Sequence, residues 1–483
     1  MVFSSLLFLL FFLPACLILC FLAGRAAGSA RPGAETAGNR ARNAVLLIFS
    51  LFFYAWGEAK CLPLLMFSAL VDYIDGRLLE KFDDRPGIRR LCLAVSLIIN
   101  FSLLGIFKYA DFFAGLANRL PGVNLPLPGI ALPIGISFYT FQTTSYSIDV
   151  YRRQVSAEKN YFRYLTYVSM FPQLIAGPIV RYRTVSEELL HRRTSGELFT
   201  DGFFRFLIGL FRKVLIANVL GELWASLSAA ADLSVAAAWL GLLTFTLQLY
   251  FDFSAYSDMA IGLGWMLGFH FEENFRYPLS AVSLTDFWRR WHISLSGWFR
   301  DYLYIPLGGN RRGRVLQLRN LLIVWFLTGL WHGASWNFVL WGLYHGLFLV
   351  LEKFVWGRFL EKLPRFFRHL YALAVIVFGF GIFYFDDLSV FGHYLTFAFG
   401  TAGNALLAAD FLWSLRNYFP VLLTALVLAF PVYPRIRAWI CSRKSGIRRI
   451  LTLTGGICCI ALYLLCLAAL VRDSYNPFLY FRF

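Results

Sequence analysis

The stretch RNLLIVWFLTGLWHGASWNFVLWGLYHGLFLVLE, residues 319–352, gives the clearest indication of the fold. It is almost entirely apolar and is longer than the ~20 residues that one helix needs to cross a bilayer. Basic segments flank it on both sides. If both flanks are cytoplasmic, the stretch enters the membrane and returns, with Gly329, Gly333 and Asn337 near the turn. If one flank lies outside, the stretch crosses the membrane. The sequence leaves both arrangements open.

The composition of the whole chain is likewise strongly apolar. Of the 483 residues, 59% are hydrophobic, 18% aromatic and 15% charged, and the mean hydropathy is +0.61. A soluble domain carries about 25% charged and about 45–50% apolar residues, so a soluble enzyme, a disordered chain and a coiled coil are excluded. The length accommodates roughly ten to twelve spanning helices. We therefore expect an all-α polytopic membrane protein, with residues 1–483 forming a single domain in a lipid bilayer.

The net charge of +17 comes from 45 Lys and Arg residues against 28 Asp and Glu residues. The basic residues gather in short segments between apolar stretches, as cytoplasmic loops do, so we expect no nucleic-acid partner. A basic cytoplasmic face also suits a polyanionic donor, such as a coenzyme that carries phosphates. The eight cysteines lie mostly within apolar runs and lack metal-ligand spacing, so we expect no metal site.

Two further stretches do not fit simple helix counting. Residues 161–180 lie between two basic loops and contain Pro172, Gly177 and Pro178, which predicts an interrupted, re-entrant segment. Residues 233–270 are longer than a bilayer is thick and carry two carboxylates near their middle, so we expect the helix to break or bend there. Carboxylates in such a segment should face protein or water. These are Asp252 and Asp258.

Residues 276–318 form a basic, amphipathic segment that we assign to the cytoplasmic side. One interpretation is an interfacial helix with an aromatic belt. The other places His292 at the mouth of a channel for the donor, together with neighbouring aromatic and basic side chains. These neighbours are Trp288, Arg289 and Arg290.

Two histidines occupy strongly apolar surroundings, where a neutral ring that can accept a proton is expected. Thirteen residues of helix from Arg319 rise about 20 Å, which places His332 deep in the membrane. The motif WHGASW around it supplies small residues and the polar Ser335, so we interpret His332 as functional. For His345 we favour a packing residue bonded to a neighbouring helix over a functional one.

The charge pattern also orients the end of the chain. The last apolar stretch, residues 450–471, follows a basic loop at 435–449 and should run outward from it. We therefore expect residues 472–483 to form an extracytoplasmic tail.

Several of these segments together resemble the membrane-bound O-acyltransferase (MBOAT) family. The similarity is closest to its bacterial branch that acetylates exported polysaccharides, typified by the alginate O-acetyltransferase membrane subunit. The segments are RNAVLLIFSLFFYAWGE at 42–58, PIGISFYTFQTTSYSIDVYR at 133–152, FPQLIAGPIVRY at 171–182, the block from FDFSAYSD to GGNRRG at 251–313, and LTGLWHGASWNFVLWGLYHG at 327–346.

The resemblance implies a ring of tilted helices around a thin core, with a central tunnel from a cytoplasmic funnel. It implies that His332 matches the buried catalytic histidine of the family and His292 its second histidine. The donor would be cytoplasmic acetyl-CoA, with no bound cofactor. The acceptor would be an exported polysaccharide such as an alginate-like polymer or peptidoglycan, and an extracytoplasmic SGNH-type transferase would complete the transfer. The location would be the bacterial cytoplasmic membrane.

On this basis His332 is expected to remove the proton of the acceptor and His292 to orient the donor. Ser335 or Asn337 would donate to the developing oxyanion. The ending FLYFRF suggests either an aromatic anchor or, by resemblance to a small peptide of the D-alanylation system, an acyl relay at Tyr480.

Three alternatives remain open at this point. Within the same class, the chain would transfer D-alanine from a carrier protein to teichoic acid. In another class, a transporter or channel would show similar re-entrant segments and intramembrane charges, although no inverted repeat is evident. In the third, the chain is a scaffold whose histidines are structural.

Overall fold

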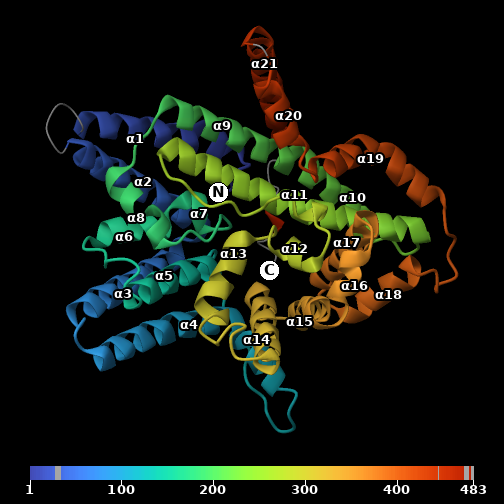
Figure 1. Ribbon diagram of the computed structural model, residues 1–483, viewed down its shortest axis with the longest axis horizontal. Coiled ribbons are helices and arrows are strands. Elements are labelled where there is room, and N and C mark those ends of the chain that lie inside the picture. The colour runs from blue at the N-terminus through green and yellow to red at the C-terminus, as the bar shows by residue number, and fades with distance from the viewer. Residues whose placement is uncertain (28–33, 444, 473–477, 480–483) are drawn as a thin grey trace. The chain divides into compact units, whose positions relative to one another are not determined.

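The computed structural model describes residues 1–27, 34–443, 445–472 and 478–479. These residues form helices and connecting segments, without a strand among them. The chain divides into two compact units. Unit 1 comprises Met1–Phe206 and Ser257–Glu273, and unit 2 comprises Leu207–Tyr256 and Asn274–Phe483. Figure 1 shows the chain coloured from its N-terminus to its C-terminus.

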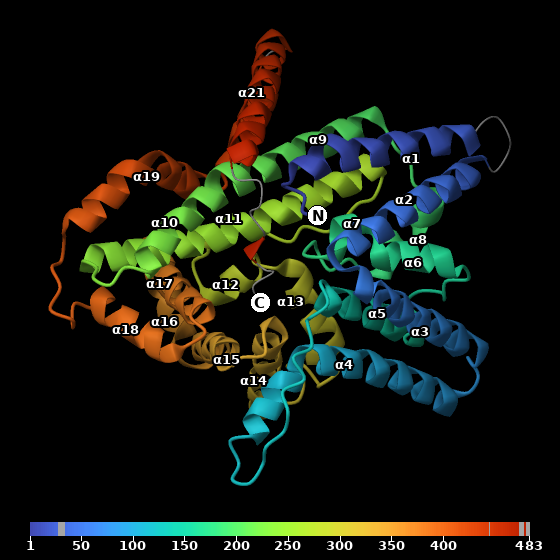
Figure 2. The ribbon, with the colours of Figure 1, turned by 180° about the vertical axis from the view of Figure 1, so that it is seen from behind.

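Unit 1 begins with long apolar helices and continues with short, interrupted ones. The helices of its first segment are α1 Leu13–Ala27, α2 Ala34–Glu58, α3 Leu62–Lys81, α4 Pro86–Ala117, α5 Ile136–Tyr151, α6 Tyr161–Ser169, α7 Phe171–Leu174 and α8 Tyr182–His191. Helices α3, α4 and α5 pack side by side (Figure 2). The polar helix α5 is almost entirely buried. It is therefore a core element of the unit.

The stretch 161–180 is interrupted as predicted. Helix α6 ends at Ser169, Pro172 lies in the first turn of the four-residue α7, and Gly177 and Pro178 lie outside any helix. Proline lacks the backbone N–H that a continuous helix needs and clashes with the preceding turn. Re-entry of this segment on one side of a membrane stays a prediction.

Unit 2 contains most of the second half of the chain. Two helices connect the units: α9 Gly196–Phe211 and α11 Val235–Leu267. The other helices are α10 Asn218–Ser228, α12 Leu284–Trp288, α13 Ile293–Phe299, α14 Arg314–His332, α15 Trp336–Leu351, α16 Gly357–Lys362, α17 Arg365–Tyr384, α18 Leu388–Ala398, α19 Ala409–Leu428, α20 Val432–Cys441 and α21 Ser445–Arg472. Short π-helical turns at 212–217, 300–304 and 352–356 join neighbouring helices.

The sequence predicts that the stretch 233–270 breaks or bends; the break is wrong, because α11 runs without interruption through both carboxylates, and a bend stays a prediction. Each carboxylate is paired within its own unit, so the helix needs no break to expose it. Lys213 pairs with Asp252 in unit 2, and Arg205 pairs with Asp258 in unit 1. Much of α11 is buried within the protein, so its length does not have to match the thickness of a bilayer.

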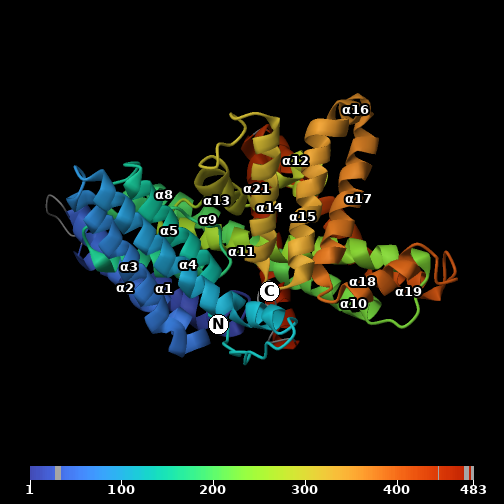
Figure 3. The same ribbon diagram turned by 90° about the horizontal axis from the view of Figure 1, so that it is seen from below.

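The chain reverses direction where the sequence suggested a turn. Helix α14 ends at His332, three residues follow, and α15 begins at Trp336. Figure 3 shows α14, α15 and α17 running side by side. Glycines permit the close approach: a Cβ on Gly329 would lie 2.3 Å from the Phe338 carbonyl oxygen, and one on Gly342 would lie 2.3 Å from the Trp325 carbonyl oxygen.

Length and composition identify the helical segments that could cross a membrane, and one of these segments, Ala37–Lys81, contains most of α2 and all of α3. Within the described ranges, eight helical segments are long and apolar enough to cross a membrane. The chain is a multi-pass, all-α membrane protein.

Candidate functional site

His332 lies in unit 2 at the C-terminal end of α14, with 5% of its surface exposed. Its Nδ1 lies 2.7 Å from the carbonyl oxygen of Thr328, one helical turn earlier. Because a carbonyl oxygen only accepts, Nδ1 carries the hydrogen. In the neutral ring this leaves Nε2 as the nitrogen with the acceptor lone pair, which is the form that a general base requires.

Aromatic rings surround His332. Its ring centroid lies 4.7 Å from that of Trp341, 5.0 Å from that of Trp331 and 5.7 Å from that of Phe383, all in edge-to-face arrangements. These side chains come from α14, α15 and α17, so the packing of the three helices fixes the ring. The setting is apolar and restricts water.

His292 lies between α12 and α13 and is 1% exposed. Its backbone has φ 44° and ψ 55°, in the left-handed region that residues with a side chain rarely adopt. Strained backbone of this kind persists only where the surroundings enforce it, and it gathers at functional sites. The strain therefore marks His292 as a residue whose position is imposed by its neighbours.

Asn274 supplies that constraint. Its carbonyl oxygen accepts the Ile293 N–H at 3.0 Å, and its Oδ1 accepts the Ser294 hydroxyl at 2.9 Å. The same Oδ1 lies 3.1 Å from Nδ1 of His292, which must donate because an amide oxygen can only accept. The sequence reasoning missed Asn274. It stands among charged residues in FEENFRYP, and no spacing rule separates it from a loop residue.

The second ring nitrogen of His292 is buried and has no hydrogen-bond partner within the part of the chain that the structure describes. Burial, reinforced by charge on His332, lowers the pKa of His292 well below its ordinary value. The ring is therefore neutral at pH 7, with its Nε2 lone pair able to accept a hydrogen bond or a proton.

The structure brings the two predicted histidines into one aromatic cluster. The Trp331 ring lies 6.2 Å from His292 and 5.0 Å from His332, so one side chain contacts both. Phe253 of α11 packs edge-on against His292 at 4.8 Å. We call these residues the histidine cluster: His292, His332, Asn274, Phe253, Trp331 and Trp341.

Trp288 lies beside this cluster. It packs against Trp325 at 4.6 Å, Trp341 at 5.7 Å and His345 at 5.0 Å. His345 is fully buried, and neither of its ring nitrogens bonds to a described residue. Trp341 contacts both His332 and His345, so the two histidines of the α14–α15 hairpin share one neighbour.

The other predicted site residues are not members of the histidine cluster. Arg289 is exposed, and Arg290 pairs with Asp286 at 2.8 Å. Ser335 precedes the first residue of α15 and is half-buried. Asn337 is fully buried and donates from Nδ2 to the Phe383 carbonyl oxygen at 3.2 Å.

The two predicted carboxylates belong to different units. In unit 1, Asp258 pairs with Arg205 at 2.9 Å. In unit 2, Asp252 is 2% exposed and pairs with Lys213 at 2.5 Å. Its second oxygen accepts the backbone N–H of Leu479 at 2.7 Å.

The end of the chain therefore returns to α11. Phe478 is 3% exposed and packs against Tyr256 at 5.0 Å and Phe253 at 5.7 Å. Phe253 also contacts His292, so the tail and the histidine cluster share a side chain. Tyr480 lies outside the described residues.

Over the described part of the chain, no group of three or more His, Cys, Asp or Glu residues is placed to hold a metal ion. Two cavities of about 420 Å³ each lie in unit 1, and neither is lined by His292 or His332. The chemistry of the histidine cluster thus depends on its ring nitrogens and on the amides and hydroxyls around them.

Comparison with known proteins identifies the family. The model of the membrane-bound O-acyltransferase family matches residues 140–394, which include both histidines. A Pseudomonas syringae pv. tomato protein named "Probable alginate O-acetylase AlgI" is 41% identical over 81% of this chain and 74% of its own length. The peptidoglycan O-acetyltransferase of Helicobacter pylori is 39% identical over 64% of each chain.

A more distant relative is the teichoic acid D-alanyltransferase of Bacillus subtilis, which is 27% identical over 52% of this chain and 68% of its own length. Alginate and peptidoglycan O-acetylation and D-alanyl transfer are all acyl transfers. The matches thus favour an enzyme over the transporter and scaffold alternatives. The chain belongs to the membrane-bound O-acyltransferase family and is an acyltransferase.

Proposed function

We propose that the protein transfers acetyl groups from cytoplasmic acetyl-CoA toward hydroxyl groups of an exported polysaccharide, with His332 as the general base. The observation that carries this proposal is the hydrogen bond from His332 Nδ1 to the Thr328 carbonyl oxygen, which orients the ring and leaves Nε2 as its basic nitrogen. Relatives named for O-acetylation of alginate and peptidoglycan support acetyl as the group and a cell-envelope polymer as the final acceptor.

The proposed step balances without a cofactor. Nε2 of His332 accepts the proton of the acceptor hydroxyl while the hydroxyl oxygen attacks the thioester carbonyl carbon. The tetrahedral intermediate collapses, the carbon–sulfur bond breaks, and the leaving thiolate takes the proton back from the imidazolium. A buried base held near its reacting partner contributes roughly 100- to 10,000-fold to such a step.

His292 and the amide of Asn337 complete the proposed site. Nε2 of His292 is held in place by Asn274 and orients the donor by accepting a hydrogen bond from it. One hydrogen of the Asn337 amide is taken by the Phe383 carbonyl, so the second is available for the oxyanion. Ser335, which is half-buried at the start of α15, is the other candidate donor.

Substrate delivery and location follow the family pattern. Trp288, Arg289 and Arg290 would lie along the path of the donor, with Arg289 exposed to meet its phosphates. The protein would reside in the bacterial cytoplasmic membrane. An SGNH-type transferase on the outer side would pass the acetyl group to the polysaccharide.

The tail offers a route for the acyl group. Tyr480 directly follows Leu479, whose N–H is bound by Asp252 next to the histidine cluster. We propose that the Tyr480 hydroxyl accepts acetyl before the external partner takes it. Protein incubated with acetyl-CoA in the absence of a partner should then yield an acetylated peptide containing Tyr480. Failure to find that peptide by mass spectrometry, while donor is consumed, would contradict the relay.

The function is tested with purified protein in lipid nanodiscs and acetyl-CoA labelled on its acetyl group. Loss of the labelled thioester should depend on His332 and should disappear in His332→Ala that still folds, as judged by gel filtration and thermal denaturation. D-alanyl transfer from a carrier protein is the second candidate, favoured by the Bacillus subtilis relative. Reaction with a carrier-borne D-alanyl thioester and none with acetyl-CoA would replace our proposal with that one.

A further inference from the structure

A second site lies in unit 1, away from the histidines. A cavity of about 420 Å³ is bounded by α1, the segment before α9, the start of α9 and the end of α11. Figures 1 and 2 show α1 and α9 next to each other. One part of the lining is apolar and the other carries two arginines and two hydroxyls. The polar residues are Arg42, Arg192, Thr194 and Ser195.

Arg192 is a buried cation. It is 3% exposed, its guanidinium donates to Oδ1 of Asn43, and it lies 4.5 Å above the ring of Phe269. Its Nε is buried and has no hydrogen-bond partner in the described chain. Burial lowers the pKa of Arg192 to about 10, which leaves the side chain charged at pH 7.

Arg42 provides a second positive charge in the same cavity. Its Nη1 donates to Oδ1 of Asn39 at 3.1 Å, and a Cβ added to Gly24 would meet its guanidinium. Among the side chains that the structure describes, no carboxylate lies within ion-pair distance of Arg42 or Arg192. Glu188 acts on Arg192 only from beyond ion-pair distance, so both cations lack a directly bonded anion, which is costly for a buried charge and which a bound anion would supply.

The start of α9 offers backbone N–H groups to an anion, against the opposing charge of the exposed Glu197 in its first turn. This helix has 16 residues, and Ser195 and Gly196 at its beginning line the cavity. The first N–H groups of a helix lack partners within the helix and carry partial positive charge. Ser195 Oγ accepts one of them, from Leu198, so others remain for a ligand.

The opposite wall is of the kind that contacts lipid chains. Ile18 is 57% exposed and Leu22 is 52% exposed, and both lie on α1, within a segment long and apolar enough to cross a membrane. Phe199 of α9 lines the cavity and is 43% exposed. The cavity is thus cationic on one side and apolar on the other, and the apolar residues are exposed at the surface of the unit.

We propose that this cavity binds the phosphate headgroup of an anionic phospholipid, with Arg42 and Arg192 on the phosphate oxygens and the acyl chains along α1. Basic pockets between membrane helices bind such headgroups. A soluble phosphate, such as that of a coenzyme, shares the anionic chemistry but would leave the apolar wall without a partner.

The test measures bound lipid by native mass spectrometry and thermal stability in detergent. Phosphatidylglycerol should stay bound and raise the melting temperature, whereas phosphatidylcholine and inorganic phosphate should not. Arg42→Gln should weaken phosphatidylglycerol binding about fivefold, the effect of one basic residue near an anionic headgroup. Arg192→Gln should do so at least as strongly. Arg193→Gln, an exposed neighbour, is the matched control and should bind as the unchanged protein does.

Two results would overturn the proposal. One is equal retention of phosphatidylglycerol by Arg42→Gln and Arg193→Gln. The other is stabilisation by inorganic phosphate that matches stabilisation by the lipid. Arg42 is only half-buried, so its variant remains informative if Arg192→Gln fails to fold. Both readouts are independent of acetyl transfer, so they separate this proposal from the proposed function.

Discussion

The hydrogen-bond network around Asp72 in unit 1 and the histidine cluster in unit 2 both bury polar side chains, but the two regions satisfy them differently. In unit 1, Asp72 of α3 is fully buried and accepts hydroxyl hydrogens from Ser96 and Ser147, each at 2.6 Å, and an amide hydrogen from Asn100 at 2.8 Å. In unit 2, His292 Nε2 and Asn337 Oδ1 are buried without a hydrogen bond to any described residue. Buried polar groups in proteins are nearly always bonded.

The difference indicates separate roles. A satisfied network joins helices and rigidifies them, whereas an unsatisfied buried group is costly and is retained where it meets a ligand. The Asp72 network links α3, α4 and α5, so we interpret it as structural. The open lone pairs of unit 2 lie beside His332, where the proposed reaction takes place.

The largest expected effect is the loss of transfer in His332→Ala. Removing the general base should lower the rate of acetyl transfer roughly 100- to 10,000-fold. His345→Leu is the matched comparison, because His345 lies in the same hairpin and also contacts Trp341. It should keep the rate within about fivefold, a packing change of about 1 kcal/mol. Rates are measured with labelled acetyl-CoA; equal losses in the two variants would contradict the special role of His332.

Asn274→Ala should have the next largest effect. It removes the oxygen that holds His292 Nδ1 and the Ser294 hydroxyl, and a buried hydrogen bond of this kind affects a rate roughly tenfold. Ser294→Ala removes only one donor to that oxygen and should cost less. For each of the two variants, the transfer rate is expressed per folded molecule, and these rates are compared. A larger loss in Ser294→Ala would show that Asn274 does not act through His292.

The sequence predicted much of this arrangement, and the reasons for its failures are physical. The turn after His332 is one of the two arrangements that the sequence allowed, since small residues interrupt an apolar stretch with basic flanks, and the catalytic role of His332 stays a prediction. Asn274 was not predictable, because its partners at 292–294 lie 18 to 20 residues away and only the fold brings them together. The continuity of α11 was missed because the partner of Asp252, Lys213, comes from a distant segment. The docking of Leu479 on Asp252 likewise has a sequence separation of 227 residues.

In unit 1, Asp72→Ala should reduce stability without changing the rate per folded molecule. Three buried donors lose their acceptor, at a cost of about 2–3 kcal/mol. Asp72→Asn keeps one acceptor oxygen and should be milder, and Asp84→Ala, which removes an exposed carboxylate from the loop after α3, is the control. Thermal denaturation and the transfer rate are measured on the same preparation. A rate that falls while the melting temperature holds would assign chemistry to this network.

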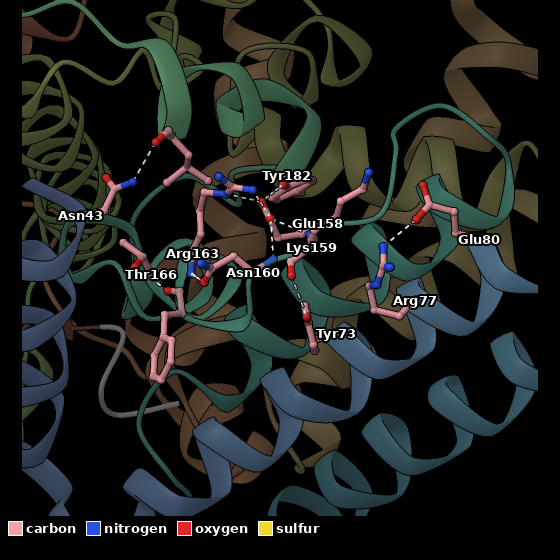
Figure 4. Close-up of polar contacts among 12 residues, drawn as sticks. Asn43, Tyr73, Arg77, Glu80, Glu158, Lys159, Asn160, Arg163, Thr166 and Tyr182 are labelled. Carbon is pink, nitrogen blue, oxygen red and sulfur yellow. Dashed lines mark hydrogen bonds and ion pairs between the residues drawn. The ribbon is translucent and has the colours of Figure 1, made fainter. Parts of the chain in front are cut away.

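The smallest expected effect is on the pH dependence of stability, through the ion pair formed by Glu158 and Arg163. Dashed lines in Figure 4 mark bonds to Glu158 from Arg163, Tyr182 and the Asn160 N–H. Burial alone would raise the pKa of Glu158, but these bonds together lower it below its ordinary 4.5. The stabilisation is therefore full above about pH 4.5 and is lost as pH falls through the lower pKa of the folded state.

Glu158→Gln removes this titration, so its melting temperature should be lower than that of the unchanged protein at pH 6 and should approach it as the pH falls below 4.5. Figure 4 also shows the matched control, Glu80, which pairs with Arg77 at 2.7 Å on the surface. Exposed pairs contribute about 0–1 kcal/mol, so Glu80→Gln should leave the pH profile nearly unchanged. Identical profiles for the two variants would mean that burial of Glu158 adds nothing to its ion pair. The expected difference between a buried and an exposed ion pair would then be absent from unit 1.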